Sequence, residues 1–276
     1  MTYFGFLFQF VGIPLILLTL VALWDTHKRK KFLPESLQSW PFRFVLTAHV
    51  IVAVVYTTPW DNYLVATSVW WYDPQLVTGI VFGWVPVEEY TFFVLQTIMT
   101  GLWILFICKR EQNWATSATN TPVIPLHNLR YLATAFVGIV WLISVWLLFS
   151  GWQPGTYLAL ELSWALLPIL LQLALGADIL WHYRWIVLWS WLPPTVYLSI
   201  GDAIAIESGT WTIDPAQSTG IFVGTLPVEE LLFFGLTNLL VVFGVILVLE
   251  RTSQERAPKA LIRFLERFQA QKETII

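Results

Sequence analysis

The chain has 276 residues, of which 57% are hydrophobic and only 12% charged, and its mean hydropathy is +0.67. Soluble domains carry about 25% charged residues, so this composition predicts an integral membrane protein. The formal net charge of -3 is too small to indicate nucleic acid as a partner, and the single cysteine, Cys108, excludes an internal disulfide and a cysteine-based metal cluster.

The first apolar segment, residues 3–24, lacks a basic leader and a small-residue cleavage site, so it predicts a membrane span rather than a signal peptide. Six further spans are predicted at residues 41–58, 75–108, 131–149, 156–175, 185–206 and 218–249. The third and seventh exceed about 30 residues, so they either tilt strongly or begin outside the hydrocarbon. The predicted fold is therefore an all-α integral membrane protein of about seven transmembrane helices.

The basic residues predict the orientation of these spans. All 15 Lys and Arg fall on one side, between spans 1 and 2, 3 and 4, and 5 and 6, and after span 7. The opposite connections carry acids and no basic residue. By the positive-inside rule, we expect the N-terminus outside and the C-terminus in the cytoplasm of the cell (inner) membrane.

A short amphipathic helix is predicted after span 7, at residues 260–270. Leu261, Phe264 and Phe268 share one face of this segment, and Arg263 and Arg267 lie on the other. This pattern is typical of a helix that lies on the cytoplasmic leaflet.

The chain contains an internal repeat. Residues 61–97 and 202–238 align without a gap at an offset of 141, with about 15 of 37 positions identical. Because the copies begin four spans apart, we expect parallel repeats about an axis along the membrane normal. The predicted divisions are a first repeat at 1–115, a connecting span at 116–150, a second repeat at 151–250 and a cytoplasmic tail at 251–276.

Each copy contains Pro-Val-Glu-Glu, at Pro86–Glu89 and again at Pro227–Glu230. If the long spans are helical throughout, Glu88 and Glu229 lie roughly 18–20 Å along them, near mid-membrane. A charge there costs at least ~3 kcal/mol, and the spans hold no internal Lys or Arg, with His49 and the outer aspartates as the nearest titratable groups. Desolvation and like-charge proximity favour neutral acids, so we expect proton donors among the four glutamates.

Aromatic residues accompany both pairs of acids. Phe92 and Phe93 lie one turn beyond the first pair, as do Phe233 and Phe234 beyond the second, and the nearby tryptophans include Trp84. We expect Pro86 and Pro227 to interrupt each helix and allow a bend into a shared pocket. Acids beside π faces are what carbocation chemistry on a hydrocarbon requires.

Structural roles remain open for several of these residues. The phenylalanines could equally serve in packing, most tryptophans in the interfacial belt, and the glutamates as hydrogen-bond partners between helices. Asp61 and Asp202 recur in both copies, where they either line the mouth of the pocket or are solvated.

At these residues the chain resembles the membrane-integral lycopene cyclase family of bacteria, archaea and fungi, which occurs as two small subunits or as one fused chain. The resemblance extends over essentially the whole chain, and the duplicated Pro-x-Glu-Glu followed by Phe-Phe carries it. It implies catalytic roles, as acid and base without an assignment of which is which, for Glu88, Glu89, Glu229 and Glu230. Trp84 stands opposite Thr225, and Tyr90 opposite Leu231, so the halves are not equivalent.

The resemblance implies a lycopene beta-cyclase, an enzyme of the intramolecular lyase or isomerase class that converts the linear ends of lycopene to β-ionone rings and gives γ-carotene or β-carotene. A protonated Glu would add a proton to the terminal double bond, and a paired carboxylate would remove one after ring closure. Phenylalanine and tryptophan side chains would stabilise the cations.

No metal or cofactor is implied, since no Gly-x-Gly-x-x-Gly motif occurs. The expected partners are a linear carotenoid that enters from the lipid, the membrane lipid itself and other carotenoid enzymes. We expect Glu→Gln at any of the four positions to reduce activity sharply.

Three alternatives remain at this point: a cyclase of longer C45 or C50 carotenoids, an enzyme that makes another ring isomer, and a proton-coupled transporter. A polyprenyl transferase is disfavoured because the chain lacks aspartate-rich clusters with basic neighbours. A retinal protein is excluded because no span contains the Lys needed for a Schiff base.

Overall fold

The computed structural model describes residues 1–28, 33–110 and 123–256. Seven long helical segments make up most of this part of the chain. They are the nearly continuous α1 (Tyr3–Phe6), η1 (Leu7–Gly12, a π-helix) and α2 (Ile13–His27), then α3 (Phe42–Ala66), α4 (Val87–Arg110), α6 (His127–Ser150), α7 (Thr156–His182), α8 (Arg184–Glu207) and α9 (Val228–Leu249).

Six of these segments are long and apolar enough to cross a membrane, and α8 is the one outside this set. The predicted all-α membrane fold is therefore confirmed. The helical turns η2 (Glu35–Leu37) and η3 (Gln153–Gly155) and the short helix α10 (Arg251–Arg256) complete the described helices. The predicted amphipathic helix at 260–270 lies outside the described residues.

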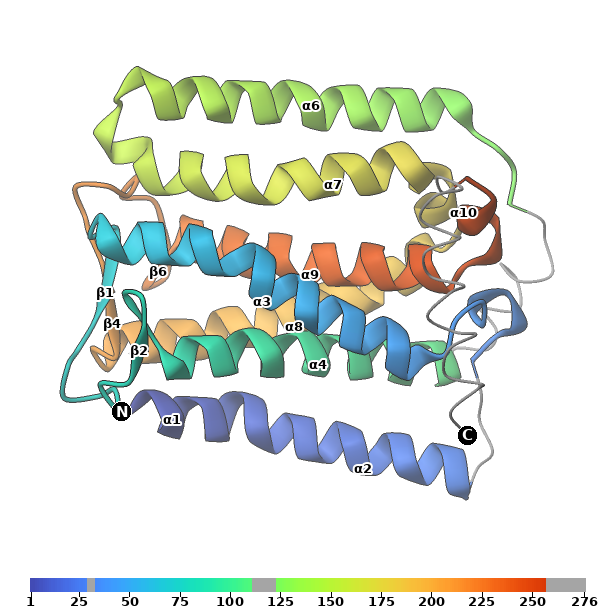
Figure 1. Ribbon diagram of the computed structural model, residues 1–276, viewed down its shortest axis with the longest axis horizontal. Helices are drawn as coiled ribbons and strands as arrows, with labels where there is room; N and C mark the ends of the chain where they lie inside the picture. Colours follow the sequence, from blue (N-terminus) through green and yellow to red (C-terminus); the bar gives the residue numbers. More distant parts are fainter. Residues whose placement is uncertain (29–32, 111–122, 257–276) are drawn as a thin grey trace.

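The long helices lie side by side in one bundle (Figure 1). α6 lies at one edge, where it packs on α7, and α2 lies at the opposite edge. α4 and α9 occupy the centre: α4 contacts α2, α3, α8 and α9, while α9 contacts α3, α7 and α8. Because the repeat offset relates α3 to α8 and α4 to α9, these contacts join the two copies of the repeat.

Equivalent residues of the two copies meet on a common axis. Strand β1 (Trp70–Tyr72) pairs antiparallel with β4 (Trp211–Ile213), and the central pair is Trp71 with Thr212, which are 141 residues apart. Farther along the bundle, Gln96 Nε2 donates a hydrogen bond to Thr237 Oγ1 over 3.0 Å, and these residues have the same separation. A pseudo-twofold axis therefore runs along the helices. The exact division of the chain at 115 and 150 stays a prediction.

The segments before α4 and α9 form β-hairpins rather than helix. Strand β2 (Val81–Phe82) pairs with β3 (Val85–Pro86), and β5 (Phe222–Val223) pairs with β6 (Leu226–Pro227). Each hairpin has a two-residue loop whose first residue is a glycine with positive φ, +70° at Gly83 and +67° at Gly224. Such loops favour glycine there because a side chain is strained in that conformation.

The predicted helical spans at 75–108 and 218–249 were therefore too long. Pro86 and Pro227 end the hairpins, and helix begins at the next residue, Val87 or Val228, because the proline ring ends strand pairing and has a φ compatible with a helix start. The glutamate pairs lie in the first turn of α4 and α9. The prediction of a mid-span position, and of a proline that bends a continuing helix, was wrong.

Ion pairs tie helices together at the other end of the bundle. Arg110 at the end of α4 binds Asp25 of α2 at 2.6 Å, and Arg256 of α10 binds Asp178 of α7 at 2.7 Å. The glutamate pairs and these arginines thus lie at opposite ends of the bundle, as the charge pattern predicts. The orientation of the bundle in a membrane stays a prediction.

Candidate active site

The second glutamate of each motif faces a single cavity at the interface of the two copies. Glu89 and Glu230 both line this cavity, whose volume is about 40 Å³. The other residues around it are Tyr3, Phe6, Trp70, Tyr72, Phe92, Tyr157, Asp202, Trp211, Phe233 and Phe234. Its walls are thus acids, phenols and aromatic rings, and none of the described residues that line it is basic.

Glu89 is held by two tyrosines. The hydroxyls of Tyr3 and Tyr72 both donate hydrogen bonds to Glu89 Oε2, at 2.5 and 2.9 Å. Tyr72 lies in β1, outside the spans, where burial and the charge of Glu89 raise its pKa well above the usual value. Tyr72 therefore remains a proton donor, and Glu89 is arranged as an acceptor.

Glu230 lies against another carboxyl group. It accepts a hydrogen bond from the hydroxyl of Tyr157 at 2.7 Å, and the carboxyl group of Asp202 lines the same cavity beside it. Two carboxyl groups can hydrogen-bond each other only when one of them is protonated, because an ionised carboxylate has no hydrogen to donate. Trp211 Nε1 donates to Asp202 Oδ1 at 3.0 Å and orients this pair.

The first glutamate of each motif binds backbone instead. Glu88 Oε1 accepts from the backbone N–H of Thr78 at 2.6 Å, and Glu229 Oε1 accepts from that of Thr219 at 2.7 Å. These two threonines are 141 residues apart and precede the hairpins. Neither Glu88 nor Glu229 lines the cavity, so the four predicted catalytic acids separate into two that face the cavity and two that fasten the hairpins to α4 and α9.

Helix starts position the acids. All four glutamates lie in the first turn of a helix, where unpaired backbone N–H groups and the helix dipole stabilise negative charge. Pro86 and Pro227 immediately precede this turn and are buried, so they position the glutamates without touching the cavity space. This is the role that the structure gives to the two prolines predicted as site residues.

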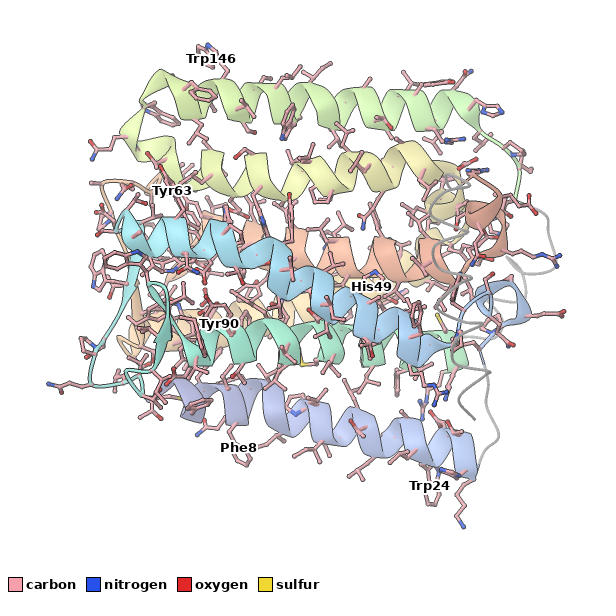
Figure 2. All side chains as sticks on the ribbon, viewed as in Figure 1. Phe8, Trp24, His49, Tyr63, Tyr90 and Trp146 are labelled. Atoms are coloured by element: carbon pink, nitrogen blue, oxygen red, sulfur yellow. The ribbon has the colours of Figure 1, made fainter. Side chains whose placement is uncertain are left out.

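Three of the four predicted phenylalanines line the cavity: Phe92, Phe233 and Phe234. The rings of Phe92 and Phe234 meet edge to face across the two copies, with centroids 6.1 Å apart. Phe93 is buried outside the cavity, against the ring of Tyr90 at 5.9 Å. Figure 2 labels Tyr90 on α4, near the end of the bundle that holds the hairpins.

Trp84 does not belong to the cavity. It lies in the loop of the first hairpin with 67% of its surface exposed, so its predicted role in cation stabilisation finds no support in the geometry. Trp70 and Trp211, which are equivalent residues of the two copies, line the cavity in its place.

Asp61 and Asp202 are both buried, which excludes the alternative that they are solvated. Asp202 lines the cavity, as described above. Asp61 is only 1% exposed, and neither of its carboxyl oxygens has a hydrogen-bond partner among the described residues. The two halves therefore differ: the aspartate of the second copy accepts a hydrogen bond from a tryptophan, and that of the first has no hydrogen-bond partner in the described part of the chain.

The tyrosines of this site are not among the residues predicted from the sequence. Tyr3 and Tyr157 are equivalent, because their backbone N–H groups bind the carbonyls of Leu76 and Gln217, which are themselves 141 residues apart. One sequence signal could have identified both tyrosines. A Thr-Tyr pair begins spans 1 and 5, and these two pairs are related by an offset of 154 rather than the 141 of the rest of the repeat.

Two further polar residues, Glu161 and His49, differ in their relation to the acids of the site. Glu161 is fully buried on α7, one turn beyond Tyr157, and neither of its carboxyl oxygens has a hydrogen-bond partner within the residues that the structure describes. His49, by contrast, lies on α3 about 18 Å along the helix from Asp61 and binds the Val45 carbonyl at 2.7 Å (Figure 2). His49 is therefore not a partner of the acids.

Comparison with known proteins identifies the family of this chain. The family model described as lycopene cyclase matches residues 1–107 and 154–249, which include both glutamate pairs and the tyrosines that bind them. The chain belongs to the lycopene cyclase family. The match omits residues 108–153 of this cyclase, which contain α6.

Named relatives agree with this assignment. The cyclase is 35% identical to the "Lycopene beta-cyclase" of Halobacterium salinarum over 248 residues, which cover 89% of this chain and 95% of that protein. It is 36% identical over 213 residues to the "Bifunctional lycopene cyclase/phytoene synthase" of Gibberella fujikuroi, and 35% identical over 198 residues to that of Blakeslea trispora. These matches cover 74% and 71% of this chain but only 34% and 32% of the fungal proteins. No solved structure matches.

Proposed function

We propose that this cyclase closes the linear ends of lycopene to β-ionone rings by acid catalysis, without net oxidation or reduction, and gives γ-carotene and then β-carotene. The ring type rests on the names of its relatives. The observation that supports the chemistry is a cavity in which the neighbouring carboxyl groups of Asp202 and Glu230 face a tyrosine-bound carboxyl group between aromatic rings, because two adjacent buried acids favour a shared proton.

The pair of Asp202 and Glu230 supplies the proton. Its shared proton is transferred to the terminal double bond of the substrate, which leaves a tertiary carbocation and a deprotonated carboxyl pair. The neighbouring double bond of the substrate then attacks this cation, so that the ring closes and the positive charge moves into the ring. Trp211 donates to Asp202 and stabilises the negative charge that the pair acquires.

Glu89 removes a proton from the ring cation. Two tyrosine hydroxyls orient its carboxylate, and loss of the proton to Glu89 forms the ring double bond. One proton enters and one leaves for each ring, so the proton must return from Glu89 to the Asp202–Glu230 pair before the next ring closes. The faces of Phe92, Phe233 and Phe234 stabilise the cations between these steps.

Glu88 and Glu229 act as positioning residues. Each holds a hairpin to the first turn of its helix, and so fixes the backbone from which Glu89 or Glu230 projects. We further propose that the enzyme lies in the cell membrane with its N-terminus outside and its C-terminus in the cytoplasm, and that its linear carotenoid reaches the cavity from the lipid.

Expression in bacterial cells that accumulate lycopene tests the function. Chromatography of the extracted pigments is expected to show γ-carotene and β-carotene, and vector-only cells provide the control. Unchanged lycopene in cells with verified membrane expression would contradict the proposal. Conversion of longer prenylated carotenoids, but not of lycopene, would instead assign the alternative substrate class.

A further inference from the structure

An apolar groove opens on the surface of the bundle between α3 and α7. Its volume is about 580 Å³. The residues around it are Ile51, Val52, Val55, Tyr56, Pro59 and Trp60 of α3 and Trp164 of α7. The acid cavity has a volume of only about 40 Å³, whereas benzene alone occupies engineered cavities of about 150 Å³. Most of a long hydrocarbon substrate must therefore lie outside the acid cavity.

Four nearly parallel rings connect the groove with the acid cavity. Tyr56 stacks on Trp164 with centroids 5.6 Å apart, and Trp164 stacks on Trp60 at 4.3 Å. Trp60 in turn stacks on Phe233 at 5.9 Å, with an angle of 5° between the ring planes. Phe233 lines the acid cavity together with Glu230. Only the rings of Trp60 and Phe233 therefore lie between the groove and the acid cavity.

Hydrogen bonds fix two rings of this series. The Tyr56 hydroxyl donates to the Trp164 carbonyl at 2.9 Å, and Trp60 Nε1 donates to the Leu160 carbonyl at 3.1 Å. The polar atoms of both α3 side chains are thus bound to the α7 backbone. The surface that these residues present to the groove is aromatic and aliphatic. Such a surface suits a planar conjugated hydrocarbon and not a polar ligand.

The equivalent surface of the other half has a different construction. Gly201 takes the place of Trp60, and Phe10 takes the place of Trp164. A Cβ atom at Gly201 would lie 3.2 Å from the Phe10 ring, which stacks on Phe6 at 5.2 Å. The two-tryptophan wall therefore exists in one half only.

We propose that this groove binds the conjugated chain of the linear carotenoid, with one end group directed past Trp60 and Phe233 to the acid cavity. This inference rests on the proposed function and adds a substrate-binding site to it. Because the wall exists on one side, both ends of a substrate molecule would use the same groove in succession.

Matched substitutions test the groove. Val55 is 67% exposed in it, and the equivalent Val196 on α8 is 46% exposed on the other half. In protein reconstituted into lipid vesicles, Val55→Trp fills the groove and is expected to raise KM for lycopene about tenfold or more. Val196→Trp is a surface change and is expected to remain within about twofold of the unsubstituted protein. Ile51→Trp and its equivalent Leu192→Trp form a second pair if Val55→Trp does not fold.

Binding of lycopene to the same vesicles, followed by the shift of its absorption bands, separates this inference from the proposed function. Loss of the shift in the groove variants alone supports the site, even if the unsubstituted protein leaves lycopene unconverted. Equal binding in all four variants, or equal loss in both members of a pair, overturns it.

Discussion

At the scale of single residues, the two glutamates of each motif differ in what their oxygens bind. Glu88 and Glu229 accept backbone N–H groups, whereas Glu89 and Glu230 bind side chains that can exchange protons. Identical dipeptides therefore contain one positioning residue and one residue that faces the cavity. The sequence predicts the four acids but not this division, because adjacent residues of a helix point about 100° apart and the direction of each depends on where the helix begins.

The division predicts unequal effects of Glu→Gln substitutions. Glu89→Gln and Glu230→Gln remove the groups proposed to move protons, so kcat is expected to fall by about 10²–10⁴. Glu88→Gln and Glu229→Gln keep an oxygen that accepts the same backbone hydrogen bond, so a loss of less than about tenfold is expected. Lycopene turnover in vesicles measures both. Equal losses at all four positions, which the sequence alone leads us to expect, would contradict the division.

Tyr3→Phe tests whether the hydroxyl orients Glu89. A hydrogen bond to a charged group contributes about 1.5–3 kcal/mol, so kcat is expected to fall roughly 10–100-fold while the ring still fills its place. Tyr63→Phe, on an exposed part of α3 labelled in Figure 2, is the control and is expected to retain full activity. Unchanged kcat in Tyr3→Phe would remove this tyrosine from the proposed mechanism.

At the scale of elements, hydropathy failed to predict the two hairpins. Residues 75–108 are predominantly apolar, and a predominantly apolar segment without clear periodicity does not distinguish a strand from a helix. The local signals were present in Gly79, Gly83 and Pro86, since glycine and proline favour turns over helix interiors. Length and composition therefore predicted the positions of the other long helices, although α8 falls short of the apolarity of a membrane span, and they failed where a short β-structure is itself apolar.

The two hairpins predict different tolerance of a methyl group. Alanine at Gly83 or Gly224 is strained by the positive φ, at about 1–2 kcal/mol. At Gly83 the new Cβ would also overlap Asn62 Oδ1, which accepts a hydrogen bond from the Trp84 backbone, whereas at Gly224 no atom lies within 4 Å. Gly83→Ala is thus expected to lower the melting temperature in detergent more than Gly224→Ala does. The reverse order would contradict this account of the first hairpin.

At the scale of the whole molecule, each copy of the repeat provides one wall of a single cavity. Tyr3, Tyr72 and Glu89 come from the first copy, and Tyr157, Asp202 and Glu230 from the second. The sequence predicts the repeat and its parallel arrangement. It also predicts a shared pocket, but not which acid of each pair lines it, because this depends on where each helix begins and on the packing of α4 against α9 across the axis.

The shared cavity predicts the behaviour of a divided chain. A break between residues 115 and 116 separates the two walls, so neither fragment alone is expected to cyclise lycopene. Co-expressed fragments are expected to regain activity, because β1 pairs with β4 and Gln96 binds Thr237 without a covalent link. Pigment analysis of cells that carry either fragment or both measures this, and activity in a single fragment would contradict a cavity built from two halves.

The position of Gln96 opposite Thr237 on the axis has an evolutionary consequence. In a homodimer every mutation appears in both subunits, so an acid and a base could not arise separately on facing walls. In a fused duplicate each wall mutates alone. The second copy has Glu161 where Leu7 stands in the first, so a duplicated chain can carry an acid on one wall that the other wall lacks.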